Sequence, residues 1–309
     1  MSAPEPVLWD GLGLDAPPGW EPAALGKGYL RLDDADGPRL TLRWQRVKPG
    51  LAPAGVLGRL KRKYRFKQDE APGRMAKQLG EALAPVGASL ACLGPDGREA
   101  VLFVLPGPPA TEGAGLAVLA APHVRPGESA QPWLDCARSL RGADQGLLRL
   151  YDVAAQAPPG FALAECSVQL GHFRFLYRAG SSSLEYHRFA PAQAILRGTS
   201  LEAWAGKVFP DRRGRARVFV PGRLPGARGG AGEGFAAALH PPVEVQASPA
   251  RRLAARWLPA LRLLRAAVWL GDESRILAVL AVHTGELSPQ FFKEVCARHV
   301  VQTPPSQAG

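Results

Sequence analysis

The sequence repeats itself, because several short patterns of the first half return in the same order in the second half. Residues 17–20 read Pro-Pro-Gly-Trp, and residues 158–161 read Pro-Pro-Gly-Phe. Further along, residues 42–46 read Leu-Arg-Trp-Gln-Arg, and residues 184–188 read Leu-Glu-Tyr-His-Arg. A repeat of this kind decides how many folding units a chain contains, so it constrains the fold more than any other feature.

The sharpest correspondence lies near the end of each half. His123 precedes Cys136 by the same number of residues by which His283 precedes Cys296, and each cysteine is followed by Ala-Arg. Chance would rarely produce so many matches in one order. We therefore predict a tandem duplication of one unit.

Each copy is predicted to be an α+β unit, in which a mostly antiparallel sheet is packed with helices. Apolar and polar residues alternate over residues 40–47 and 173–178, as in half-buried strands. Helical periodicity predicts a helix over residues 53–66 in copy one and over residues 200–209 in copy two. Thr199 is the expected cap of the second of these helices. A further helix is expected at the end of each copy.

The length of 309 residues is about twice that of a usual domain, which agrees with two units. We place the first α+β repeat at residues 1–144 and the second at residues 145–309. The second repeat also carries an insertion rich in Arg, Gly and Pro at about residues 210–234. That composition predicts a surface loop.

The formal net charge of +11 is concentrated in two segments. Residues 59–67 hold six cations and no acid, residues 210–228 hold six arginines and one acid, and the rest of the chain is neutral. An anionic partner would be attracted to these segments, although a GC-rich coding sequence is an alternative source of the arginines. The candidate anion- or partner-binding residues are Arg59, Lys61, Arg62, Lys63, Arg65, Lys67, Arg212, Arg213, Arg215 and Arg217.

Arg46 and Arg188 recur at the same place in the two copies. By strand alternation each lies on the same face as an aromatic neighbour, Trp44 or Tyr186. An arginine there can stack on a ring or bind a carboxylate. A structural role and a role in lining a ligand site are therefore both open.

The remaining motifs predict neither a metal nor a cofactor. Cys136 and Cys296 are expected on the apolar faces of the terminal helices, which favours structural thiols over a zinc site. Residues 232–237 match the Gly-x-Gly-x-x-Ala pattern of a dinucleotide-binding loop, but Pro241 follows too soon for the helix that such a loop requires. No catalytic residue is predicted, and we lean against an enzyme, although an active site assembled from distant residues stays open.

The sequence predicts a cytoplasmic location. Its N-terminus does not resemble a secretory signal peptide, and its apolar runs are far shorter than the roughly 18 residues that a membrane-spanning helix needs. Four cysteines are too few for a disulfide framework in a chain of this length. These features agree with a reducing compartment.

A β-rich part, then a helix, a hairpin and a terminal helix, after the turn at residues 17–20, resembles the Mog1/PsbP-like α+β sandwich. The resemblance covers each half separately and brings no functional residues with it. Members of that family serve mostly as accessory or binding proteins, so the resemblance implies such a role.

We predict a non-catalytic binding or accessory protein that engages an acidic protein partner through its basic surfaces. One alternative is a nucleic-acid-binding protein, because Tyr64 and Phe66 interleave with the cations of residues 59–67 and could stack on bases. The other is an enzyme or small-anion receptor with a site between the two repeats, where Arg46 and Arg188 would hold an anion.

Overall fold

The computed structural model describes residues 4–48, 55–56, 58–59, 73–84, 89–93, 99–106, 115–211, 214–222, 242–245, 262–284 and 288–302. The chain divides into two compact units, Met1–Tyr151 and Asp152–Gln302, and each unit combines helices with antiparallel sheet. The α+β class is therefore confirmed. The boundary lies at residues 151/152, whereas the sequence prediction placed it at residues 144/145.

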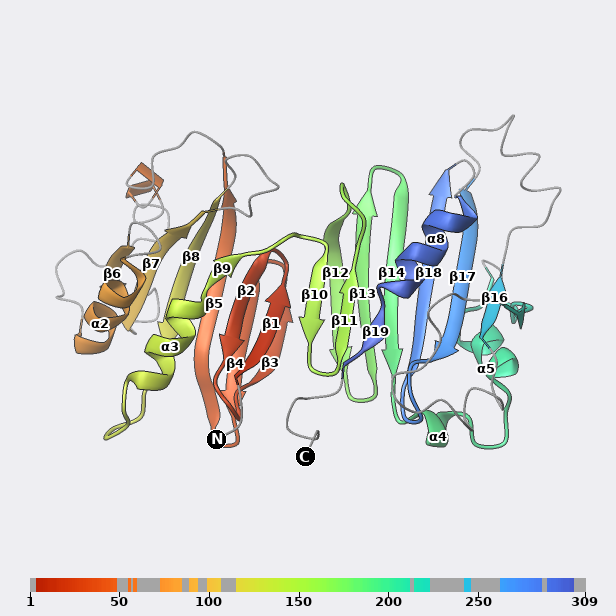
Figure 1. The fold of residues 1–309 in the computed structure, drawn as a ribbon, viewed down its shortest axis with the longest axis horizontal. Helices are drawn as coiled ribbons and strands as arrows, with labels where there is room; N and C mark the ends of the chain where they lie inside the picture. Colours follow the sequence, from red (N-terminus) through yellow and green to blue (C-terminus); the bar gives the residue numbers. More distant parts are fainter. Residues whose placement is uncertain are drawn as a thin grey trace. The chain divides into compact units, whose positions relative to one another are not determined.

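The main sheet of unit 1 is antiparallel, with the strand order β3-β4-β5-β8-β7-β6. Its strands are β3 (Glu21–Gly26), β4 (Tyr29–Asp34), β5 (Gly37–Val47), β6 (Ser89–Leu93), β7 (Glu99–Leu105) and β8 (Gly115–Pro122). One face packs into an apolar cluster that includes Val47, Val56 and Leu102. Helices α2 (Arg74–Leu83) and α3 (Gln131–Ser139) lie in front of the sheet in the view of Figure 1.

Unit 1 also contains four short strands outside its main sheet. They are β1 (Glu5–Trp9), β2 (Leu12–Ala16), β9 (Arg141–Gly142) and β10 (Leu147–Leu150), paired in the order β10-β1-β2-β9. α3 contacts β2, and the Ser139 hydroxyl accepts a hydrogen bond from the Asp15 N–H at 2.8 Å. The small sheet and the helix thus form one layer.

The main sheet of unit 2 is antiparallel as well, with the order β12-β13-β14-β18-β17-β16-β15. Its strands are β12 (Ala162–Gln169), β13 (His172–Ala179), β14 (Ser182–Phe189), β15 (Val220–Pro221), β16 (Val243–Val245), β17 (Arg262–Leu270) and β18 (Ile276–Thr284). Its helices are α4 (Ala192–Ile195), α5 (Leu201–Val208) and α8 (Pro289–Ala297), and β11 (Val153–Gln156) pairs with β19 (Val300–Val301).

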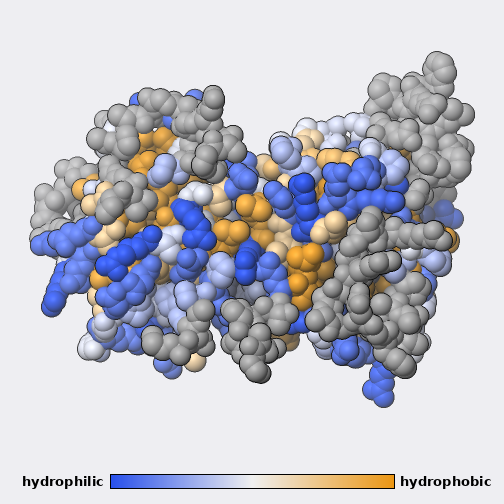
Figure 2. Space-filling view, viewed as in Figure 1, coloured by the Kyte–Doolittle hydropathy of each residue, from blue (hydrophilic) through white to orange (hydrophobic). Residues whose placement is uncertain are grey.

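The two faces of this sheet are covered by different elements. Phe189 packs with Leu201 and Ala205 of α5 in one apolar cluster. On the other face, the Arg265 guanidinium lies 5.4 Å from the ring centre of Phe292 in α8. Because side chains alternate along a strand, successive residues of β14 point to these two faces alternately. The outer surface of α8 is mostly hydrophilic, as are those of α2 and α3 (Figure 2).

The strand order of the two main sheets is the same up to β15, which extends the second sheet by one short strand. The repeated Pro-Pro-Gly turns also have the same geometry. Trp20 N–H donates to the Pro17 carbonyl at 3.0 Å, and Phe161 N–H donates to the Pro158 carbonyl at 3.2 Å. The turn glycines, at positions 19 and 160, have φ values of 79° and 85°, a conformation that glycine adopts without strain.

Of the helix expected over residues 53–66, only residues 55–56 and 58–59 are described, and they are helical. Elsewhere the helices differ from the prediction. α2 was not predicted. The cap of α5 is Ser200 rather than Thr199, because Ser200 has the extended backbone of an N-cap and its hydroxyl accepts from the Ala203 N–H at 3.3 Å. Within the described residues, no helix is long and apolar enough to span a membrane.

Candidate functional site

Three of the predicted cationic residues lie in the described part of the chain. Arg59 is exposed in the short helical segment. Arg215 is exposed and lies 3.4 Å from the Asp211 carboxylate, and the Arg217 Nε donates to the Pro210 carbonyl at 3.0 Å. The other candidates lie outside the described residues: Lys61, Arg62, Lys63, Arg65, Lys67, Arg212 and Arg213.

The structure places Arg188 in an ion pair of its own unit. Its Nη2 donates to Asp152 Oδ2, its guanidinium carbon lies 4.9 Å from the ring centre of Phe173, and its side chain is 13% exposed. Arg275 binds the same carboxylate. The structural alternative for Arg188 is therefore favoured over ligand lining.

Arg46 lies on β5 and is more exposed than Arg188. The negative charge of Asp10 acts on its guanidinium. The Trp44 indole N–H donates to the Asp10 carbonyl at 3.0 Å, so the aromatic neighbour of Arg46 contacts the same residue. Each of the two recurring arginines thus interacts with an aspartate of its own unit.

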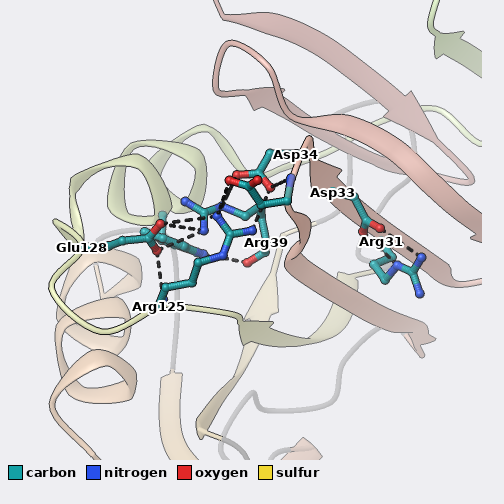
Figure 3. Close-up of polar contacts among 8 residues, drawn as sticks. Arg31, Asp33, Asp34, Arg39, Arg125 and Glu128 are labelled. Carbon is teal, nitrogen blue, oxygen red and sulfur yellow. Dashed lines mark hydrogen bonds and ion pairs between the residues drawn. The ribbon is translucent and has the colours of Figure 1, made fainter.

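An extensive ion-pair cluster of unit 1 surrounds Arg39, which is only 7% exposed (Figure 3). Its Nη1 donates to both Glu128 oxygens at 2.9 and 3.0 Å, and its Nε lies 3.1 Å from Asp34 Oδ2. Its guanidinium carbon lies 4.7 Å from the ring centre of Trp133 and 5.6 Å from that of Trp20. The cluster ties the β4–β5 hairpin to α3 and to the segment before it, which is a structural use.

Arg125 extends this cluster toward the solvent. Its guanidinium binds Asp34 at 2.9 Å and Asp36 at 3.2 Å, and its N–H donates to Glu128 Oε2 at 2.9 Å. The N–H of Arg125 and the guanidinium of Arg39 lower the pKa of Glu128 below its usual value. All of these carboxylates are therefore balanced by arginines within the cluster.

A different kind of cluster lies on β13 and β14 of unit 2, where two histidines and a glutamate form a continuous chain of hydrogen bonds. Arg174 Nε donates to Glu185 Oε2 at 2.8 Å, and His187 Nε2 lies 3.2 Å from the same oxygen. His187 Nδ1 lies 3.0 Å from His172 Nε2. We name this arrangement the Glu185–His187–His172 chain.

The ionised carboxylate at one end fixes the direction of the whole chain. Burial alone would raise the pKa of Glu185, but the hydrogen bonds from His187 and Arg174 outweigh it and hold the pKa at about 2. Glu185 is thus an acceptor, so His187 carries its proton on Nε2 and accepts at Nδ1. His172 must then donate from Nε2, which leaves its Nδ1 as an acceptor.

Aromatic rings surround the two imidazoles. The Phe189 ring stacks on His172 with centroids 4.1 Å apart and planes 4° apart, and Phe209 meets His187 edge-on at 5.1 Å. His187 is buried, with 4% of its surface exposed, whereas His172 is half-buried. The chain therefore runs from the part-exposed Glu185 through the buried His187, which packs against Phe209, to the half-buried His172 on the same face of the sheet.

Sequence reasoning missed this chain. It used residues 184–188 only for Tyr186 and Arg188, which lie on one face of β14. The alternate residues Glu185 and His187 lie on the other face, and that alternation was a visible signal. The pairing with His172 could not be seen, because it depends on the register of β13 against β14.

The two cysteines of the terminal helices, Cys136 and Cys296, are buried, as expected for structural thiols. Burial raises the pKa of the Cys136 thiol to about 12. His123 Nε2 lies 3.0 Å from the Thr41 hydroxyl. No group of three or more His, Cys, Asp or Glu within the described ranges is arranged to hold a metal ion.

Comparison with known proteins found no matching family, no similar curated protein and no similar solved structure. Function is therefore inferred from the residues of this chain alone.

Proposed function

We propose that this chain is a non-catalytic binding or accessory protein that engages an acidic protein partner through basic surfaces at residues 59–67 and 210–228. The observation that carries the proposal is the charge distribution. These two segments hold the entire net charge of +11, and the rest of the chain has equal numbers of cations and acids. A local excess of this size attracts anions and speeds their association.

The described body supports this assignment because many of its arginines are paired with nearby carboxylates. Ion pairs of 2.8 to 3.2 Å join Arg31 to Asp33, Arg138 to Asp135, Arg141 to Asp15 and Arg178 to Glu165. Paired charges of opposite sign cancel at a distance. A partner would therefore respond mainly to the two basic segments.

The proposal includes the duplication of one α+β unit. The shared strand order of the two main sheets and the matching Pro-Pro-Gly turns support it. Duplication would place the two basic segments at related positions, since each begins within or just after a corresponding helix of its copy. The Mog1/PsbP-like resemblance and the cytoplasmic location remain predictions that agree with an accessory role.

Binding to defined anionic probes tests the proposal. We expect the intact chain to bind an acidic polypeptide such as poly-glutamate, with an affinity that falls as salt is added. Single-stranded and duplex DNA serve as the comparison. If DNA bound more tightly, with a log-log salt slope near about −4.5 for roughly five neutralised phosphates, the nucleic-acid alternative would replace the acidic protein partner.

Charge reversal provides the matched control. Replacing Arg62 and Lys63 by Glu should weaken the binding of poly-glutamate by roughly tenfold or more, because two attractive charges become repulsive. Replacing the exposed residues Lys77 and Arg197 by Glu changes the net charge equally and should have a much smaller effect. Equal losses in the two variants, or no binding at low salt, would contradict a localised basic surface.

A small-anion receptor built on Arg46 and Arg188 is less well supported, because the Asp152 carboxylate already binds Arg188. No described contact favours it over the proposal above.

A further inference from the structure

The face of β13 and β14 that packs against α5 through Phe189 also carries a hydrogen-bond chain, which ends on the half-buried side chain of His172. We propose that His172 is the hydrogen-bond-accepting centre of a binding site for a neutral, hydroxyl-bearing ligand, such as a sugar or another polyol. The site lies in unit 2 and does not depend on the basic segments. It is therefore a second binding function, separate from the one proposed above.

The first argument is the fixed direction of the chain. Glu185 orients His187, and His187 orients His172. The acceptor nitrogen at the end of the chain is therefore Nδ1 of His172. His299 of the same unit offers a contrast, because it is 1% exposed and its Nε2 bonds to the His187 carbonyl at 2.9 Å. A buried imidazole is thus tied to the protein, whereas the half-buried one presents an acceptor.

The second argument is that the His172 ring is neutral at physiological pH. Burial, followed by the charges of His187 and Arg174, lowers the pKa of His172 to about 4. A neutral ring with a proton on Nε2 accepts at Nδ1 and cannot donate there. An O–H or N–H group of a ligand is the complementary partner.

The third argument is the charge balance around His172. Arg174, two residues from His172 on β13, is paired with Glu185 at 2.8 Å and with Glu165 at 3.5 Å. An anionic or cationic ligand would have to compete with these pairs. A neutral ligand can instead use the remaining hydrogen-bonding capacity of the paired groups.

The strand register supplies further polar groups on the same face. Gln169 of β12 lies directly opposite His172, and Ser167 lies opposite Arg174. Side-chain amides, hydroxyls and paired charges suit a neutral ligand that presents several hydroxyl groups.

Nitrogen-detected NMR of the imidazoles in the intact chain tests both parts of the inference. The spectrum should show the proton of His172 on Nε2, with Nδ1 unprotonated. Glucose, galactose, mannose and trehalose are then titrated, with glucose 6-phosphate and gluconate as charged comparisons. We expect at least one neutral sugar to shift the His172 Nδ1 resonance saturably, because a new hydrogen bond forms at that atom.

Variants separate binding from folding. His172→Phe should weaken the affinity for the active sugar about tenfold, whereas His172→Gln, which keeps an acceptor, should weaken it less. His123→Phe removes a half-buried histidine of unit 1 and should leave binding unchanged. Thermal unfolding of each variant shows whether it is folded.

Three results would overturn the inference. One is a proton on Nδ1 of His172. Another is the absence of a saturable shift with every neutral sugar, even at about 100 mM, where a millimolar site would be nearly saturated. The third is a response to the charged comparisons alone. None of these results bears on poly-glutamate binding, so the two proposals can fail separately.

Discussion

Single side chains of this protein connect segments that are far apart in the sequence, and Arg39 is the clearest case. Its guanidinium lies over the rings of Trp20 and Trp133 and binds Asp34 and Glu128, a partner 89 residues away. Removing one partner of a buried ion pair leaves the other charges uncompensated, which costs more than the pair itself contributes.

We therefore expect Arg39→Ala to lower the free energy of unfolding by about 2–4 kcal/mol, through lost ring contacts and lost ion pairs to Asp34 and Glu128, which keep their contacts with Arg125. Arg31→Ala is the matched control, because Arg31 binds Asp33 at the same 2.8 to 2.9 Å range but is far more exposed. Its expected cost is below about 1 kcal/mol. Urea unfolding of both variants measures the difference, and equal costs would show that burial of Arg39 does not matter.

The positions of single residues could be predicted from the sequence only where a local pattern determines them. Strand alternation placed Arg188 beside Tyr186 on one face, and the structure agrees. The partner of Arg188, Asp152, could not be read from the sequence, because it lies 36 residues earlier and outside any shared pattern. The same holds for His172 and His187, whose contact depends on the pairing of two strands.

The buried His299 makes stability depend on pH. Its ring lies against Tyr186 and Trp269, and burial lowers its pKa to about 4 even though its hydrogen bonds to backbone carbonyls raise it. Between about pH 6.5 and pH 4 the unfolded chain therefore binds a proton that the folded chain excludes. Stability should fall as the pH falls through this window, by about 3 kcal/mol for this residue at its acid end.

Unfolding free energies from urea melts between pH 7 and pH 4 measure this dependence. His172, with a pKa of about 4, and His187, whose pKa is lowered by burial, act in the same direction, so the wild-type slope includes all three rings. His299→Phe keeps an aromatic ring in the site and should flatten the slope. A variant with an unchanged slope, or a protein that gains stability on acidification, would contradict the assignment.

At the scale of elements, two helical glycines with different surroundings offer a direct comparison. Gly206 of α5 is pressed against the chain that follows it, since a Cβ there would lie 2.5 Å from the Arg217 backbone oxygen. Gly80 of α2 has room, because a Cβ there would meet only the Ser89 hydroxyl at 3.7 Å. Gly206→Ala should therefore destabilise the protein by about 1–3 kcal/mol.

Gly80→Ala should instead stabilise the protein by about 0.5–1 kcal/mol, because alanine is the better helix former. The unfolding free energies of the two variants show whether the two substitutions change stability in opposite directions. Opposite signs are expected, and two stabilising changes would mean that the segment against Gly206 can move away at little cost.

Elements were predictable where local chemistry decides the conformation. The turns at residues 17–20 and 158–161 follow from proline, which fixes φ, and glycine, which accepts a positive φ. α2 was missed although Ala76, Leu79 and Leu83 lie on one helical face. Only three of its ten residues are buried, so the packing of this face against the sheet supplies most of the stability of the helix. The sequence does not reveal that packing.

At the scale of the whole molecule, unit 2 closes on itself through its first and last strands. β11 begins the unit and pairs with β19 at its end, with Ala154 opposite Val300, and Gln302 N–H donates to the Asp152 carbonyl at 2.7 Å. Both ends of the unit are therefore tied together by its own backbone. We expect a fragment of residues 152–302 to fold alone and to unfold in one cooperative transition.

A fragment that stops at residue 298 tests the reason for this behaviour. It lacks β19 and His299, so the hydrogen bonds to β11 and the ring packed between Tyr186 and Trp269 are lost. Its free energy of unfolding should be lower by about 3 kcal/mol or more, since a buried aromatic group and a strand pairing are removed together. Circular dichroism and urea unfolding compare the two fragments. Equal stability would mean that the closing strand is not what makes unit 2 an independent folding unit.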